Sequence, residues 1–191
     1  MKQLERSDLL NTEDYLKERE LRRTQVIALR KLRRIQVGDC LSFVFENRDT
    51  VRYQIQEMMR VERITDDGKI QHEIDTYNEL IPEPGSLSAT MFIEITETEK
   101  IKAVLDTMQG LDRLNTVFFQ INGDKVFAEF EPGHSKEDRI SAVHYVKFRF
   151  SQDQIAHFKD SQVRLVVRHP ADQAETVLSS AQKLELAEDF E

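Results

Sequence analysis

The segment Arg48–Pro82 constrains the fold of this chain more than any other segment. Apolar residues recur at helical spacing on both sides of the tripeptide Asp66-Asp67-Gly68. This tripeptide is typical of a turn, because glycine tolerates a positive φ and aspartate caps its own backbone. The segment therefore predicts two helices that lie side by side and antiparallel.

The first of these helices places a glutamate where a core residue is expected. At ~100° per residue, Glu62 projects close to the middle of the apolar face that Val51 and Ile55 define. Glu73 lies on the flank of the apolar face of the second helix. If the two faces meet, the carboxylates repel each other unless a cation, a proton or an arginine lies between them. The alternative is that one or both reach the surface or pair with a nearby arginine.

Composition limits the class of protein. The 191 residues suit one domain, and 39% hydrophobic residues suffice for a core. The net charge of -8 disfavours general nucleic-acid binding, which depends on phosphate neutralisation. Cys40 is the one cysteine, so no multi-cysteine metal site is expected. With no apolar leader and no stretch long enough for a membrane span, we expect a soluble cytoplasmic protein.

The remaining pattern predicts a single α+β domain with a mainly antiparallel sheet packed against the antiparallel helix pair. Residues 1–34 form an N-terminal helical extension, residues 35–178 the α+β core, and residues 179–191 a C-terminal helix that frays into an acidic tail. The clearest hairpin surrounds Asn122-Gly123, which supplies the positive φ angles of a type I′ turn.

The end of the N-terminal helix is strongly basic. Between Arg22 and Arg34 the chain has six basic residues and no acidic one. A solvated helix face is one explanation. The others are a docking site for an acidic partner, or for the acidic tail of this chain, ELAEDFE.

Two histidines extend the glutamate pair into a candidate metal site. His144 and His169 both fall on the inward phase of predicted strands. A helix pair lying on that sheet could bring them together with Glu62 and Glu73. Mixed imidazole and carboxylate ligands suit iron, manganese or zinc. The alternative is that each histidine is a hydrogen-bonded core residue.

A second candidate site lies on the opposite face of the first helix, where three arginines and a glutamine line up. This stripe suits a carboxylate, a phosphate or an acidic protein surface. The alternative is pairing within the chain, with Glu57, Asp66 or Asp67. The stripe consists of Arg52, Gln56, Arg60 and Arg63.

The segment Arg52–Ile64 has the pattern R-Y-Q-x-Q-E-M-x-R-x-E, which resembles the signature of a bacterial family known only as a domain of unknown function. Tyr77–Pro82, Ser141–His144 and His169-Pro170 are similar to its other recurrent segments, so the likeness covers nearly the whole chain. The resemblance implies no established activity. Genes of this family often lie beside genes for rubrerythrin-like proteins and iron–sulfur oxidoreductases, which implies a partner of that kind.

We therefore expect an accessory protein of a cytoplasmic redox or oxidative-stress system that binds metal through the four predicted ligands. The alternative is a non-catalytic binding module that docks an acidic redox partner or an anion through the arginine stripe. The third possibility is a metal-dependent enzyme. The chain has no Walker loop, G-x-G-x-x-G, G-x-S-x-G or H-E-x-x-H motif, so the sequence does not decide whether it is an enzyme.

Overall fold

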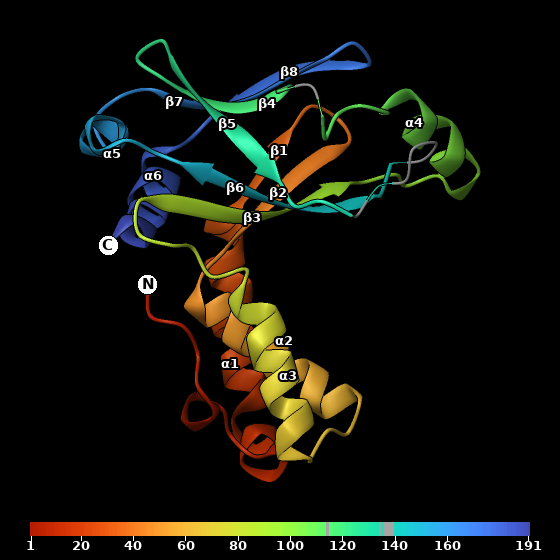
Figure 1. Cartoon of the computed structure of the whole chain (residues 1–191), viewed down its shortest axis with the longest axis vertical. Helices are drawn as coiled ribbons and strands as arrows, with labels where there is room; N and C mark the ends of the chain where they lie inside the picture. Colours follow the sequence, from red (N-terminus) through yellow and green to blue (C-terminus); the bar gives the residue numbers. More distant parts are fainter. Residues whose placement is uncertain (114, 134, 136–139) are drawn as a thin grey trace.

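A computed structural model of the chain describes residues 1–113, 115–133, 135 and 140–191. It has two parts, a sheet that curls into a barrel and a bundle of helices that projects from it (Figure 1). We call the helical part, which comprises the N-terminal segment, α1, α2 and α3, the stalk. None of the helices in the described ranges has the length and apolar character that crossing a membrane requires.

The barrel is an antiparallel sheet of eight strands in the order β1-β2-β3-β6-β5-β4-β7-β8. The edge strands β1 and β8 nearly close it, since the Thr176 hydroxyl of β8 donates to the carbonyl of Gln36 in β1 at 2.6 Å. The strands are β1 (Arg34–Val37), β2 (Leu41–Glu46), β3 (Ser86–Ile93), β4 (Val117–Ile121), β5 (Asp124–Phe130), β6 (Val143–Arg149), β7 (Val163–His169) and β8 (Asp172–Val177).

The helices begin at side-chain caps. Asn11, Asn47, Ser151 and Ser179 each accept a backbone N–H of the first turn that follows. The α-helices are α1 (Thr12–Arg33), α2 (Arg48–Val61), α3 (Asp67–Asn78), α4 (Ile101–Thr107), α5 (Gln152–Phe158) and α6 (Ser180–Ala187). Short 3-10 helices occupy Arg6–Asp8 (η1), Thr98–Lys100 (η2) and Glu188–Phe190 (η3).

The α+β composition and the antiparallel sheet are confirmed, but the expected layering of sheet against helix pair is wrong. The sheet curls round its own apolar face, so it buries that face without help from α2 and α3. Phenylalanines fill the interior, and Phe119 contacts the rings of Phe45, Phe148 and Phe158 at centroid distances of 5.7, 4.8 and 6.3 Å. The helix pair is left to pack against α1 and the N-terminal segment.

The stalk has a separate apolar core. Its buried side chains are Leu4, Leu9, Val51, Ile55, Met59, Ile64, Ile70, Ile74, Leu80 and Ile81. Two buried amide side chains bind the N-terminal segment to this core. Asn78 exchanges two 2.9 Å hydrogen bonds with the backbone of Leu4, and Gln56 accepts from the N–H of Leu10 at 2.7 Å and donates to its carbonyl at 3.1 Å.

Arg33 joins the stalk to the barrel and to the C-terminus. Its guanidinium is fully buried and donates to the carbonyls of Phe45 and Glu46. It also forms ion pairs with Glu185 and Asp189. The acidic tail therefore docks on the basic end of α1, as one of the alternatives predicted, and it does not fray.

Burial raises the pKa of Asp189 to about 6, although the adjacent Arg33 favours the ionised carboxylate. One oxygen of Asp189 is buried without a hydrogen-bond partner in the described part of the chain. A buried pair of this kind costs desolvation, so its main effect is to fix how the parts fit together.

The turn between α2 and α3 lies earlier than the sequence predicts. Asp66 is the N-cap of α3 and accepts the N–H of Lys69 at 3.0 Å, so Asp67 and Gly68 belong to the first helical turn. The chain reverses at Arg63 instead, where φ is 54°. As a result α2 ends at Val61 and Glu62 is its C-cap.

Candidate functional site

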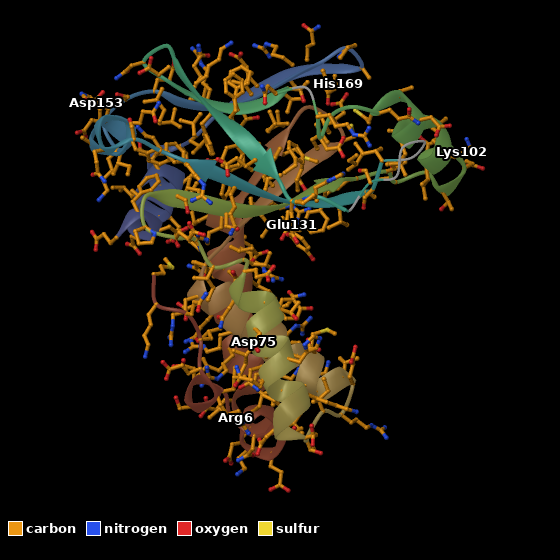
Figure 2. All side chains as sticks on the ribbon, viewed as in Figure 1. Arg6, Asp75, Lys102, Glu131, Asp153 and His169 are labelled. Atoms are coloured by element: carbon orange, nitrogen blue, oxygen red, sulfur yellow. The ribbon has the colours of Figure 1, made fainter. Side chains whose placement is uncertain are left out.

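The structure separates the four predicted metal ligands. Glu62 is exposed at the end of α2, because the helix stops one residue before it, and Glu73 is half-buried on α3. Both lie on the stalk. In Figure 2, Asp75 of the same helix lies well below the barrel, whereas His169 lies at its far side.

Both histidines hydrogen-bond to backbone carbonyls of residues that lie outside the strands. His144 is buried, and its Nε2 lies 2.9 Å from the carbonyl of Ser141. His169 is also buried, with Nε2 3.0 Å from the carbonyl of Gln109 and Nδ1 accepting the N–H of Ala171 at 3.2 Å. The ring of His169 therefore uses both nitrogens to hold the chain at this end of the barrel.

The expectation that a helix pair would carry the glutamates to the histidines is thus wrong, because α2 and α3 project away from the sheet (Figure 1). Across residues 1–113, 115–133, 135 and 140–191, no three histidine, cysteine, aspartate or glutamate side chains gather in a way that could hold a metal ion.

The four residues of the arginine stripe have different partners and do not form one site. Gln56 is buried against the backbone of Leu10 and belongs to the stalk core. Arg60 pairs with Glu57 at 3.0 Å, which is one of the intramolecular pairings the sequence suggested. Arg63 is exposed at the turn. Arg52 pairs with the exposed Asp49 at 2.8 Å and keeps a partly exposed guanidinium.

Glu57 is the centre of the polar network on the stalk. It accepts hydrogen bonds from Tyr15 and Arg19 of α1 at 2.8 Å, and from Arg60 at 3.0 Å. The bond from Arg19 lowers the pKa of Glu57 to about 2, with help from Arg60 and Tyr15 and against the effect of burial. The network ties α1 to α2, so its role is structural.

Arg52 lines a groove of about 210 Å³ between α1 and α2, which we call the stalk groove. Arg22 comes from the α1 side and Tyr53 from the α2 side. The ion pairs of both arginines are exposed, with Arg22 bound to Glu18 at 2.7 Å one turn earlier. Exposed pairs of this kind contribute only about 0–1 kcal/mol, so an incoming carboxylate can replace them.

An apolar stripe runs along α1 beside the stalk groove. Residues at intervals of three and four share one side of a helix. Leu21, Gln25, Leu29 and Leu32 follow this spacing, and Gln25 and Leu29 line the groove itself. Leu21 is 64% and Leu32 38% exposed, so apolar surface continues from the groove along α1.

A second cleft, of about 240 Å³, lies where the stalk meets the outer wall of the barrel, and we call it the waist cleft. Its floor is formed by β2, β3 and β6, and its sides by the end of α1, the first half of α2 and the end of α3. The lining residues are Arg30, Arg34, Val44, Glu46, Val51, Gln54, Tyr77, Leu80, Thr90, Phe92, Val143 and Tyr145.

Glu46 is the charged group at the floor of the waist cleft and is only 7% exposed. One carboxylate oxygen accepts the hydroxyl of Thr50 at 2.6 Å and the other the hydroxyl of Thr90 at 3.0 Å. No motif or core-phase position in the sequence singles out Glu46. Its position was a usable signal, since Glu46 directly precedes the N-cap Asn47 and so lies next to the N-terminus of α2, where a carboxylate is favoured.

The fold and its grooves define a class of protein in which a nearly closed antiparallel barrel carries a helical stalk. One solved structure of this kind is a novel protein of unknown function from Burkholderia pseudomallei K96243. It has a TM-score of 0.92 and 30% sequence identity, over 100% of both chains. The model of the family described as "Protein of unknown function (DUF3501)" matches residues 3–190, and the chain belongs to this family. Comparison with curated proteins gives no match.

Proposed function

We propose that this protein is a binding module that docks an acidic segment of a partner protein in the stalk groove. The observation that carries the proposal is the pairing of two partly exposed arginines, Arg22 and Arg52, with an exposed leucine stripe on the same side of α1. Apolar contact would supply affinity, and the guanidinium groups would select carboxylates.

The charge distribution favours an acidic partner. The chain as a whole has a net charge of -8, yet the part of α1 beside the groove lies in a run of basic residues without an acid. The net negative charge repels an acidic surface, whereas this basic run attracts one, so the docking orientation is restricted.

The partner that the family resemblance implies, a rubrerythrin-like or iron–sulfur protein in a redox or oxidative-stress system, stays a prediction. It fits the proposal if such a protein presents an acidic, apolar segment. Metal binding by Glu62, Glu73, His144 and His169 is not part of the proposal, since these side chains lie on separate parts of the molecule.

Photo-crosslinking tests the docking site directly. A photoreactive residue placed at Gln25, beside the groove, should capture a defined protein in the native cells. The same residue placed at Lys102, an exposed position on α4 of the barrel side, is the control. Capture of the same proteins from both positions would contradict the proposal.

Charge reversal then tests the chemistry with the captured partner. Arg22→Glu combined with Arg52→Glu should weaken its binding by roughly tenfold or more, with little change in the melting temperature. Lys102→Glu should leave binding unchanged. If the double variant binds as the wild type does, the groove is not the docking site.

A further inference from the structure

The waist cleft has the composition of a small-molecule site that is independent of the stalk groove. It lies between two separately packed parts of the molecule, where ligand sites commonly occur. Its volume, about 240 Å³, is smaller than the ~300–1,000 Å³ typical of sites for drug-sized ligands. The cleft therefore suits a compact metabolite.

Glu46 gives the floor of the cleft a buried negative charge. Hydroxyl donors from Thr50 and Thr90 hold both oxygens in place. Among the described residues, the two threonine hydroxyls are its side-chain partners, and no lysine, arginine or histidine pairs with it. A nearly buried carboxylate without a cationic partner can bind a ligand ammonium group strongly, because little water competes.

Aromatic side chains line the same cleft as this carboxylate. Tyr77, Phe92 and Tyr145 line the cleft, and aromatic faces favour cations. Burial raises the pKa of Tyr145, and the neighbouring Tyr77, Glu131 and Glu46 raise it further. Tyr145 is therefore close enough to Glu46 for their charges to interact.

Two arginines also line the cleft. Arg30 extends from α1, where one of its terminal nitrogens donates to Gln54 at a long 3.3 Å. Its Nε is buried and has no hydrogen-bond partner in the described ranges. Arg34 is already bound to Ser42 and Glu94, and its guanidinium lies 5.9 Å from the centre of the Phe92 ring. Arg30 is thus the guanidinium with donors left for an anionic group.

We propose that the waist cleft binds a small zwitterion of the α-amino acid class. In this arrangement Glu46 receives the ammonium group and Arg30 the carboxylate. Both charged groups of the ligand would then be paired inside a cleft too small for large side chains.

The test uses the full chain and the proteinogenic amino acids as individual probes at millimolar concentration. The unfolding temperature should rise with at least one of these amino acids, because a ligand that binds only the folded state stabilises that state. Titration calorimetry then compares that amino acid with its decarboxylated and deaminated analogues. Each analogue should bind roughly tenfold or more weakly, since each leaves one charge of the cleft unpaired.

Two variants assign the ligand to the cleft. Glu46→Gln and Arg30→Gln should each weaken binding of the same amino acid by roughly tenfold. Glu175→Gln and Arg168→Gln, which alter an ion pair between β7 and β8, are matched controls and should bind as the wild type does. Glu46 also supports the start of α2, so if its variant does not fold, Arg30→Gln decides.

The proposal is overturned if no amino acid raises the unfolding temperature. It is also overturned if an analogue that lacks one charge binds as tightly as the amino acid, or if Arg30→Gln leaves the affinity unchanged.

Discussion

The barrel encloses a cluster of phenylalanine rings, whereas the stalk packs a smaller set of aliphatic side chains and binds its own N-terminal segment through polar groups. In the barrel, stability comes from apolar area and from a sheet with almost no free edge. In the stalk, the buried amides of Gln56 and Asn78 fix the N-terminal segment, and the Glu57 network fixes α1 against α2. The comparison indicates that the barrel is the rigid base and the stalk the part that local changes can loosen.

The largest effect should come from the centre of the barrel. Phe119→Ala removes a fully buried ring that contacts several other phenylalanines and should cost about 3–5 kcal/mol of unfolding free energy. Urea unfolding monitored by circular dichroism measures it. Phe127→Ala, at a ring that is 40% exposed, is the matched control and should cost far less. Equal losses would contradict the barrel as the main stabilising core.

The second largest loss of stability should come from Arg33, which links the stalk to the barrel and the C-terminus. Arg33→Met leaves Asp189 and Glu185 without their cation and should cost about 3 kcal/mol, because breaking a buried pair from one side leaves a buried charge. The double variant Arg33→Met, Asp189→Leu should recover most of this loss. If the double variant is no more stable than the single one, the ion pair does not explain the effect of Arg33.

Loss of the hydrogen bonds between Gln56 and the backbone of Leu10, which we call the Gln56 clamp, should lower the unfolding free energy less. Gln56→Ala leaves the N–H and carbonyl of Leu10 without partners and should cost about 1–3 kcal/mol. The N-terminal segment should also become sensitive to limited proteolysis, while the barrel stays resistant. Gln71→Ala, on the exposed face of α3, is the control. Equal protease sensitivity in both variants would contradict the clamp.

Acid should weaken the stalk selectively. The pKa of Glu57 is about 2 in the folded protein, whereas the ordinary pKa of a glutamate is 4.5. The ionised Glu57 therefore stabilises the fold fully above about pH 4.5, and this contribution is lost as the pH falls through about 2. The contribution is roughly 1–2 kcal/mol after allowance for partial exposure. Glu57→Gln should remove this part of the pH dependence. An unchanged acid profile in that variant would show that the network does not hold the stalk.

Local patterns predicted much of the fold. Asn122-Gly123 forms the expected hairpin turn, with φ angles of 50° and 97°. Closure of the barrel was not predictable, because it depends on residues distant in sequence. At Gly38, where φ is 65°, a Cβ would lie 3.0 Å from Asp172 and 3.1 Å from Ala174 of β8. No local periodicity records this approach of β1 to β8.

The sites were less predictable than the fold, for two physical reasons. The helix α2 ends at Val61, well before the predicted turn at Asp66-Asp67-Gly68, and this moved Glu62 from a predicted core face to the surface. Glu46 acquired its environment from Thr90 on another strand and from Tyr145 on a third, which no spacing in the sequence relates. Inward phase did locate His144 and His169 in the interior, but their partners are backbone carbonyls.

Native-state hydrogen exchange tests the central claim, that the barrel and the stalk are separately packed, most directly. Amides of α2 and α3 should exchange through local opening at a lower free energy than amides of β3, β4, β6 and β7, which should exchange only by global unfolding. Gln56→Ala should accelerate exchange in the stalk and leave the barrel strands unchanged. A single exchange free energy for stalk and barrel, shifted equally by this substitution, would contradict the account.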